Sequence, residues 1–377
     1  MTLQDSPTVI ERTEDRTSYF VRFPWKLEKR LMPSKAWQLV SIALALLGSA
    51  LATALLILVA GASVSDALSA MVTGAFGSGK AIAETLVQAT PLIFTGLAVT
   101  VAFRARVWNI GAEGQFFAGA MGATWFAMTF GEKLPSAVAI PIVILMGILC
   151  GALWAALPGL LKIRFGTNEI IVTVMLNFVI VYILSYLLSD PWRAPNSYYY
   201  QSPILPTSTN FPRLIAGTRL HLGFILALLT AIGVYLLLWK TAFGYEIRAI
   251  GINPTAASYK GIPVAKVMLL VIILSGAIAG LAGACEVPGL QPRLRLEVST
   301  GYGFTGIIIA MLGRLHPVGV VLAAIFFGAL VTGSSAMQIA VNVPVAIAQA
   351  VQGITLLLLL IADVLSQYRI RRWDRNE

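Results

Sequence analysis

FRARVWNIGAEGQ, at residues 103–115, connects two long apolar stretches with no conventional loop between them. It carries Asn109, Glu113 and Gln115 within or close to the second stretch. A carboxylate at bilayer depth costs roughly 2.5–3.5 kcal/mol on insertion scales, and it normally faces protein or a water-filled cavity. Two interpretations are open: a tight interhelical turn in which Glu113 pairs with Arg104 or Arg106, or a segment that lines or gates a path through a membrane.

The two stretches belong to a series that runs through the whole chain. Of 377 residues 58% are hydrophobic and 12% charged, with mean hydropathy +0.82, whereas soluble domains have about a quarter of their residues charged. Apolar windows of about 20 residues predict spans at 37–60, 81–103, 109–130, 136–160, 169–188, 222–239, 267–287, 303–313, 316–336 and 346–365. The sequence therefore predicts an all-α polytopic membrane protein with about ten transmembrane segments, some short or discontinuous.

The ends of the chain differ from this transmembrane domain, which we expect to occupy residues 37–365. About 36 mostly polar residues come first, so the apolar run from Trp37 to Ala60 is predicted to be a retained helix and not a signal peptide. Residues 1–36 are then a cytoplasmic segment of open role. Residues 366–377 form a basic cytoplasmic tail.

The basic residues are distributed unevenly between the two predicted sides. Of the 27 lysines and arginines, the predicted outside segments contain only Lys80, Lys133, Arg193, Arg213, Arg219, Arg293 and Arg295. Cytoplasmic loops are enriched in Lys and Arg, so both termini are expected in the cytoplasm. The net charge of +10 thus reflects topology and not a nucleic-acid partner, and the lipid bilayer is the expected surrounding.

Two long polar loops interrupt the apolar pattern. Residues 189–221 form an outside loop rich in proline, with the run Tyr198 to Tyr200; an interfacial cap and a docking role are both open. Residues 240–266 form the longest internal cytoplasmic loop, in which Tyr245 to Ile252 is amphipathic and predicts a short helix along the membrane surface.

Nothing in the sequence indicates catalysis, a metal site or a cofactor in this chain. The two cysteines, Cys150 and Cys285, lie in apolar runs, and the two histidines are predicted on opposite sides of the membrane.

Two runs match nucleotide-binding patterns but lack the required context. GAFGSGK at 74–80 fits a phosphate-binding loop, but Ala81 replaces the magnesium-binding Ser/Thr and no strand precedes it. GYGFTG at 301–306 has no βαβ unit around it, so close packing and a local turn explain its glycines better. An ATP-driven function would need a separate ATPase chain.

Several ordered motifs together resemble the permeases of bacterial nucleoside importers, within the ribose-type (branched-chain amino acid/ribose permease) family of ABC importers. They are NIGAEGQ at 109–115, GTNEIIVTVMLN at 166–177, GYEIRAIGINPTAASYKGI at 244–262 and GYGFTGIIIAMLGRLHPVGV at 301–320. The resemblance covers nearly all of the chain after residue 80. Sugar and nucleoside permeases of this group look alike, so a simple sugar is the alternative substrate.

The resemblance implies a multi-subunit importer in the bacterial cytoplasmic (inner) membrane. An extracytoplasmic binding protein would deliver the solute, this chain and a second, paralogous permease would form the path, and ABC ATPase subunits holding ATP and magnesium would drive transport. Loop 240–266 would contain the coupling helix. The residues implied to contact the ATPase are Tyr245, Glu246, Arg248, Gly251, Asn253 and Ala256.

Polar and apolar side chains within the spans are the candidates for the translocation path. They are Glu84, Gln88, Asn109, Glu113, Gln115, Met175, Asn177, Glu286, Phe304, Gln349 and Gln352. Most are neutral and no basic cluster lies among them, which favours an uncharged solute such as a nucleoside over a nucleotide. An ion-coupled secondary transporter, with Glu84 as its best carboxylate, is a further alternative.

Overall fold

The structure is a computed structural model that describes residues 25–29, 35–195 and 197–372. Helices make up most of it, with short 3₁₀ turns at Gly131–Lys133, Thr207–Thr209 and Leu296–Val298. The helices are α1 (Lys35–Val59), α2 (Val64–Phe76), α3 (Gly79–Arg104), α4 (Ala112–Phe130), α5 (Ser136–Phe165), α6 (Glu169–Ser189), α7 (Leu222–Lys240), α8 (Ala242–Ile252), α9 (Pro254–Tyr259), α10 (Val264–Gly289), α11 (Tyr302–Leu312), α12 (Pro317–Val341) and α13 (Val345–Gln367). The strands are β1 (Trp25–Lys29) and β2 (Tyr368–Arg372).

Each of the ten predicted segments corresponds to a helix. Within the described residues, eight helices are long and apolar enough to cross a membrane, namely α1, α3, α5, α6, α7, α10, α12 and α13. The predicted short segment is α11, whose 11 residues span only about 16 Å at 1.5 Å per residue. Helix α2 was not predicted, because its 13 residues are fewer than a spanning window requires.

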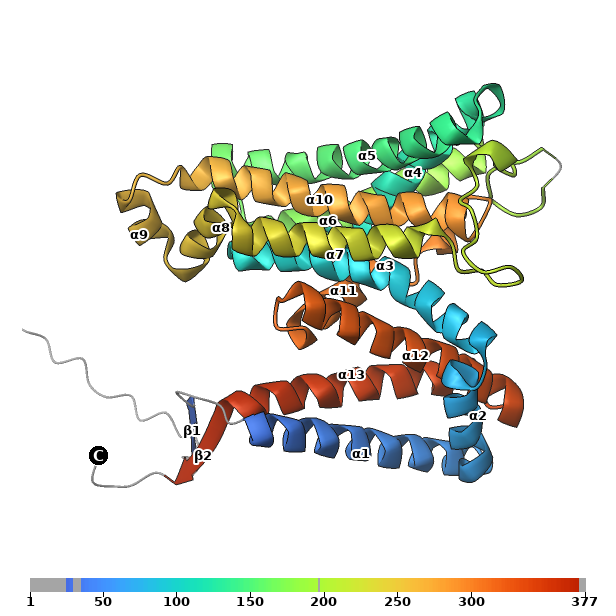
Figure 1. The fold of residues 1–377 in the computed structure, drawn as a ribbon, viewed down its shortest axis with the longest axis vertical. Coiled ribbons are helices and arrows are strands. Elements are labelled where there is room, and N and C mark those ends of the chain that lie inside the picture. The colour runs from blue at the N-terminus through green and yellow to red at the C-terminus, as the bar shows by residue number, and fades with distance from the viewer. Residues whose placement is uncertain (1–24, 30–34, 196, 373–377) are drawn as a thin grey trace, which may run out of the picture.

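The helices form two groups joined by α3 (Figure 1). One group contains α4, α5, α6, α7 and α10, and the other contains α1, α2, α12 and α13. Helix α3 packs against α7 and α10 on one side and against α11 and α12 on the other. It is accordingly the most deeply buried of the spanning helices.

Small residues bring α5 and α10 into close contact, because glycine and alanine let helix backbones approach each other. A Cβ atom built on Gly151 would lie 2.4 Å from the carbonyl oxygen of Gly276, and one on Gly280 would lie 2.3 Å from that of Gly147. The backbones therefore touch directly. Helix α4 packs against both helices and completes this layer.

The two ends of the described chain meet at one end of the bundle (Figure 1). Strands β1 and β2 pair antiparallel, with Trp25 opposite Arg372, and α1 packs along α13. This sheet was not predicted. Most of the predicted segment 1–36, and residues 373–377 of the predicted tail, lie outside the described residues.

The two long loops lie at opposite ends of the bundle. Helices α8 and α9, which contain most of loop 240–266, lie at the same end as the sheet, and loop 189–221 lies at the other (Figure 1). This arrangement agrees with the sidedness expected from the basic residues, because β1 and β2, at the two ends of the described chain, lie on the side of α8 and α9.

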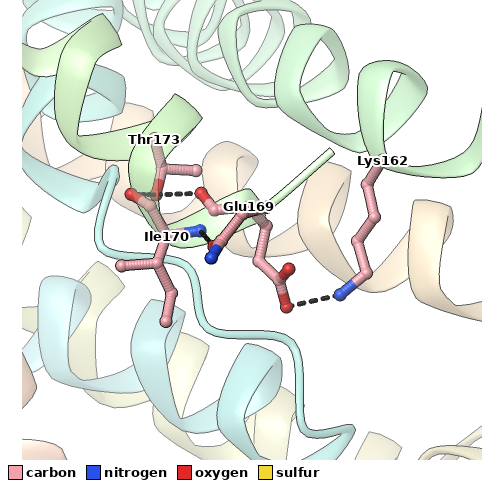
Figure 2. A network of polar contacts seen from close by, with 5 residues as sticks. Lys162, Glu169, Ile170 and Thr173 are labelled. Atoms are coloured by element: carbon pink, nitrogen blue, oxygen red, sulfur yellow. Dashed lines mark hydrogen bonds and ion pairs between the residues drawn. The ribbon is translucent and has the colours of Figure 1, made fainter. Parts of the chain in front are cut away.

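The turn between α5 and α6 shows how local sequence begins a helix (Figure 2). Gly166 ends α5 in the left-handed region at φ 65°, and the Asn168 side chain accepts a hydrogen bond of 2.9 Å from the Ile170 amide. Glu169 in the first turn of α6 forms an ion pair with Lys162 in the last turn of α5. The Glu169 carboxylate also lies near the positive end of the α6 dipole, where a negative charge is favourable.

The topology makes a direct prediction for two exposed tyrosines. Tyr198 is 90% exposed in loop 189–221 and Tyr259 is 89% exposed at the end of α9. In a background lacking Cys150 and Cys285, Tyr198→Cys should react with an impermeant thiol reagent in intact cells. Tyr259→Cys should react only in inverted membrane vesicles. The parent without cysteines is the control, and the opposite labelling pattern would overturn the assigned sides.

Candidate functional site

The N-terminal ends of α4 and α11 meet at one carboxylate. Glu113 lies in the first turn of α4 and is buried. Its Oε2 accepts a hydrogen bond of 2.6 Å from the backbone amide of Gly303, in the first turn of α11. A helix N-terminus carries about half a positive charge and unpaired amides. Glu113 therefore compensates two helix ends at once, which accounts for a carboxylate among apolar segments.

The glycines of residues 301–306 allow this contact. A Cβ atom on Gly303 would lie 2.2 Å from the Glu113 nitrogen, so only glycine permits α11 to approach α4 so closely. Gly301 precedes α11 with φ 92°, a conformation that glycine adopts without strain. The prediction that these glycines serve close packing and a turn is confirmed.

A network of amides holds the segment between α3 and α4. The Asn109 Nδ2 donates to Gln115 Oε1 and to Ser275 Oγ, both at 2.9 Å, and Gln115 Nε2 returns a bond of 3.0 Å to Asn109 Oδ1. Ser275 in turn donates to the carbonyl oxygen of Ala98 on α3, at 2.7 Å. Ser275 lies 11 residues beyond the start of α10, about 16 Å along the helix, so the network lies deep in the bundle.

Asn177 of α6 completes the same region. Its Oδ1 accepts from the Gly114 amide at 2.8 Å, and its Nδ2 donates to the Ile110 carbonyl at 3.0 Å. Asn177 thus supplies partners for the carbonyl of Ile110, where the chain is not helical, and for the amide of Gly114 in the first turn of α4. Irregular backbone at membrane depth needs such partners from protein or water.

The structure corrects one interpretation of this segment and leaves the other as a prediction. Glu113 pairs with neither Arg104 nor Arg106, because its partner is the Gly303 amide; the proposed ion pair is wrong. Arg104 instead donates to the Leu315 carbonyl, beyond the far end of α11. Asn109 and Gln115 bond to each other in the interior, and their predicted place along a path stays a prediction.

A polar cavity of about 430 Å³ lies between α3, α11, α12 and α13. It brings together Gln88, Gln349 and Gln352, which the sequence proposed as path residues. Its other lining residues are Leu92, Thr300, Tyr302, Thr305, Phe327, Val331, Ser335, Gln338, Val345 and Ala348. None of the lining side chains is a charged type, although amides, hydroxyls and a phenol are abundant. We refer to it as the glutamine-lined cavity.

Sequence reasoning missed several residues of these two sites. Ser335 and Gln338 lie three apart on α12 and four and seven residues after Val331, which is the spacing of one helix face. That spacing was a usable signal for a polar stripe. Ser275 gave no comparable signal, because it is one small residue among many in α10.

The other predicted path residues lie elsewhere. Glu84 forms an ion pair with Arg219, whose Nε donates to it at 3.0 Å. Glu286 is buried on α10, and its Oε1 has no hydrogen-bond partner among the described residues. Met175 and Phe304 are partly exposed on the surface of the chain, at 54% and 44%.

The predicted coupling segment forms two short helices. The Ile247 and Ile250 side chains are fully buried under α8, so this helix lies firmly on the bundle. Tyr245, Asn253 and Ala256 are exposed. The remaining members of the predicted set, Glu246, Arg248 and Gly251, are partly buried. Within the described ranges, no cluster of three or more His, Cys, Asp or Glu residues could hold a metal ion.

Comparison with known proteins shows extensive similarity to transport proteins. Residues 81–360 match the family model described as branched-chain amino acid transport system / permease component. The guanosine ABC transporter permease protein NupP of Bacillus subtilis is 38% identical over 88% of this chain and 94% of its own length. The glucose ABC transporter permease protein TsgB13 of Haloferax volcanii is 35% identical, over 81% and 82%. A second guanosine permease of B. subtilis, NupQ, is 30% identical, over 66% and 79%.

Removal of the Glu113 carboxylate should destabilise the fold. Glu113→Leu leaves the buried Gly303 amide without an acceptor and should cost about 1–3 kcal/mol, whereas Glu113→Gln keeps an acceptor and loses the charge near the dipoles, about 1 kcal/mol. Thermal unfolding of the purified protein in detergent should therefore rank wild type above Gln and Gln above Leu. The exposed carboxylate of Glu132 provides the control Glu132→Leu. A melting temperature unchanged by Glu113→Leu would contradict this role.

Proposed function

Because the chain belongs to the branched-chain amino acid transport system / permease component family, we propose that it forms the membrane path by which an ABC importer takes up a nucleoside. The chain is an ABC transporter permease subunit with many membrane-spanning helices, and it is not itself an ATPase. The identity of the solute is a separate proposal, and it rests on the chemistry of the glutamine-lined cavity.

The uncharged polar lining is the observation that supports a nucleoside. A nucleoside is neutral and combines hydroxyls with a flat base, and glutamine amides both donate and accept hydrogen bonds. Tyr302 and Phe327 border the same cavity, so aromatic faces are available to a base. The volume of about 430 Å³ lies within the usual range of about 300–1,000 Å³ for small-molecule sites. The similarity to NupP points the same way.

A simple sugar is the second candidate, and the similarity to the glucose permease of H. volcanii supports it. A sugar would use the same amides and hydroxyls. It would gain less from the aromatic residues, since it has no base to stack on them.

The family works with ATPase and binding-protein subunits, and we propose the following finer arrangement. The second permease is a paralogous chain, because this chain is similar to two different guanosine permeases of one organism. ATP and magnesium are held by the ATPase, which contacts the exposed face of α8 and α9. The complex lies in the bacterial cytoplasmic membrane.

The outside face offers a firm surface for the binding protein. Loop 189–221 is joined to the loop after α10, where the Ser202 amide donates to the Leu294 carbonyl at 3.0 Å and the Leu294 amide donates to Ser202 Oγ at 2.8 Å. Tyr198 and Arg293 border one hollow of this surface. Tyr and Arg are frequent anchors in protein interfaces, which favours docking over a purely interfacial cap.

Uptake measurements test the proposed substrate. Cells with and without this gene, both expressing the binding protein, should differ in uptake of radiolabelled guanosine, adenosine and uridine. Glucose and ribose are the comparison solutes. Loss of sugar uptake alone would favour the second candidate, and the absence of an ATPase from the purified complex would contradict the importer itself.

A substitution of Gln349 tests whether the cavity contacts the solute, because within the described residues this side chain has no structural hydrogen bond to lose. Gln352 donates to Ser334 at 2.6 Å, whereas Gln349 is exposed and has no side-chain hydrogen bond among the described residues. Gln349→Leu should lower guanosine uptake about fivefold to tenfold at subsaturating solute, the effect of one lost hydrogen bond. Gln291→Leu, at a different outer pocket, is the matched control. Equal uptake by both variants would remove Gln349 from the path.

A further inference from the structure

We propose that Arg104 is the positioning residue that connects the α8–α9 segment to α11, so that displacement of this segment by the ATPase moves one wall of the glutamine-lined cavity. The inference rests on the proposed function. It assigns to one side chain a mechanical link between the coupling segment and the path.

The first link is a backbone contact between α8 and the end of α3. A Cβ atom on Gly251 would lie 2.0 Å from the Arg104 carbonyl oxygen and 3.9 Å from the Ala105 Cα. Helix α8 therefore lies directly on the last residue of α3. Because Ile247 and Ile250 are fully buried beside it, α8 cannot shift without pressing on this end of α3.

The second link is the Arg104 side chain. Its Nε donates to the Leu315 carbonyl at 2.9 Å, and its Nη2 reaches the Arg314 carbonyl at 3.4 Å. Both acceptors belong to the turn that follows α11. Arg314 and Leu315 have φ of 54° and 53°, a left-handed conformation that is unfavourable for side chains with a Cβ. The guanidinium thus holds a strained turn, and such turns are common in parts of proteins that switch.

The third contact restrains Arg104 from the direction of α7. The Trp239 ring lies 5.1 Å from the guanidinium carbon, a cation–π distance, and Trp239 is the residue before the end of α7. Only Thr241 separates α7 from α8. Arg104 therefore contacts both α7, through Trp239, and the backbone of α8, through Gly251.

Helix α11 carries the displacement to the cavity. Glu113 binds its N-terminal turn and Arg104 binds the turn after its C-terminus, so residues 104–113 hold both ends of an 11-residue helix. Tyr302 and Thr305 of α11 border the cavity. Arg314 also pairs with Asp363 of α13 at 2.7 Å, and α13 supplies Gln349 and Gln352 to the cavity lining. Movement at Arg104 is therefore passed through the turn after α11 to two of the helices that line the cavity.

The test measures transport and ATP hydrolysis on the same preparation. The complete complex, purified with its ATPase and binding protein and reconstituted in vesicles, is supplied with guanosine and, separately, with glucose. Arg104→Met should leave binding-protein-stimulated ATP hydrolysis within about twofold of wild type and lower the solute taken up per ATP about tenfold or more, since charged hydrogen bonds are lost. Arg104→Lys keeps the charge but lacks the planar set of donors of a guanidinium. Its uptake per ATP should lie between that of wild type and that of Arg104→Met.

Matched variants make the result decisive. Arg106→Asn removes a neighbouring exposed arginine whose φ of 56° asparagine tolerates, and it should transport normally. Gly251→Ala should reproduce the loss per ATP through the backbone contact, and it carries the test if Arg104→Met does not fold. Gly233→Ala on α7, where a Cβ meets nothing within 4 Å, is its control.

Three outcomes would overturn the proposal. Unchanged uptake per ATP in both Arg104→Met and Gly251→Ala would show that no force passes through this contact. A parallel fall in melting temperature, ATP hydrolysis and uptake would make Arg104 a structural residue only. If wild-type complex contains no ATPase or takes up neither solute, the proposed function fails, and this inference fails with it.

Discussion

A single carboxylate makes it possible for two helices to begin inside the bundle. Glu113 accepts the Gly303 amide and lies in the first turn of α4, so it meets the partial positive charge of two N-termini. Two unpaired helix ends facing each other in a medium without water would be strongly unfavourable. The start of α11 inside the bundle and its close approach to α4 both depend on this interaction.

The same segment is held by side chains of α4, α6 and α10. Asn109, Gln115 and Ser275 form hydrogen bonds with one another, and Asn177 bonds to the backbone around the turn. The uncharged cavity lies beside it, along α11. Helix α11 is bound by Glu113 at its N-terminal turn, and Tyr302 and Thr305 border open space, which is a suitable arrangement for a helix that moves as a unit.

The sequence predicted the fold class well because hydropathy and loop charge are local properties. The spans, the short α11 and the short helix α8 all follow from composition and spacing. The partner of Glu113 could not be predicted, since Gly303 lies 190 residues away and contributes only a backbone amide. The cavity was found in part: Gln88, Gln349 and Gln352 stood out as amides in apolar segments, whereas Ser335 and Gln338 required the helix face to be known. The sheet between β1 and β2 joins two polar segments whose proximity depends on the whole bundle.

The contact between α1 and α13 has a consequence for synthesis of the protein. Ser49 and Thr355 share a buried hydrogen bond across 306 positions of sequence, so α1 is joined by a helix that is made much later. Until α13 is made, α1 has only lipid or the insertion machinery against the face that later meets α13, and contacts of such long sequence separation form slowly. A ribosome that stalls before Thr355 would therefore leave α1 without the helix that packs along it, however well the helices between the two have assembled.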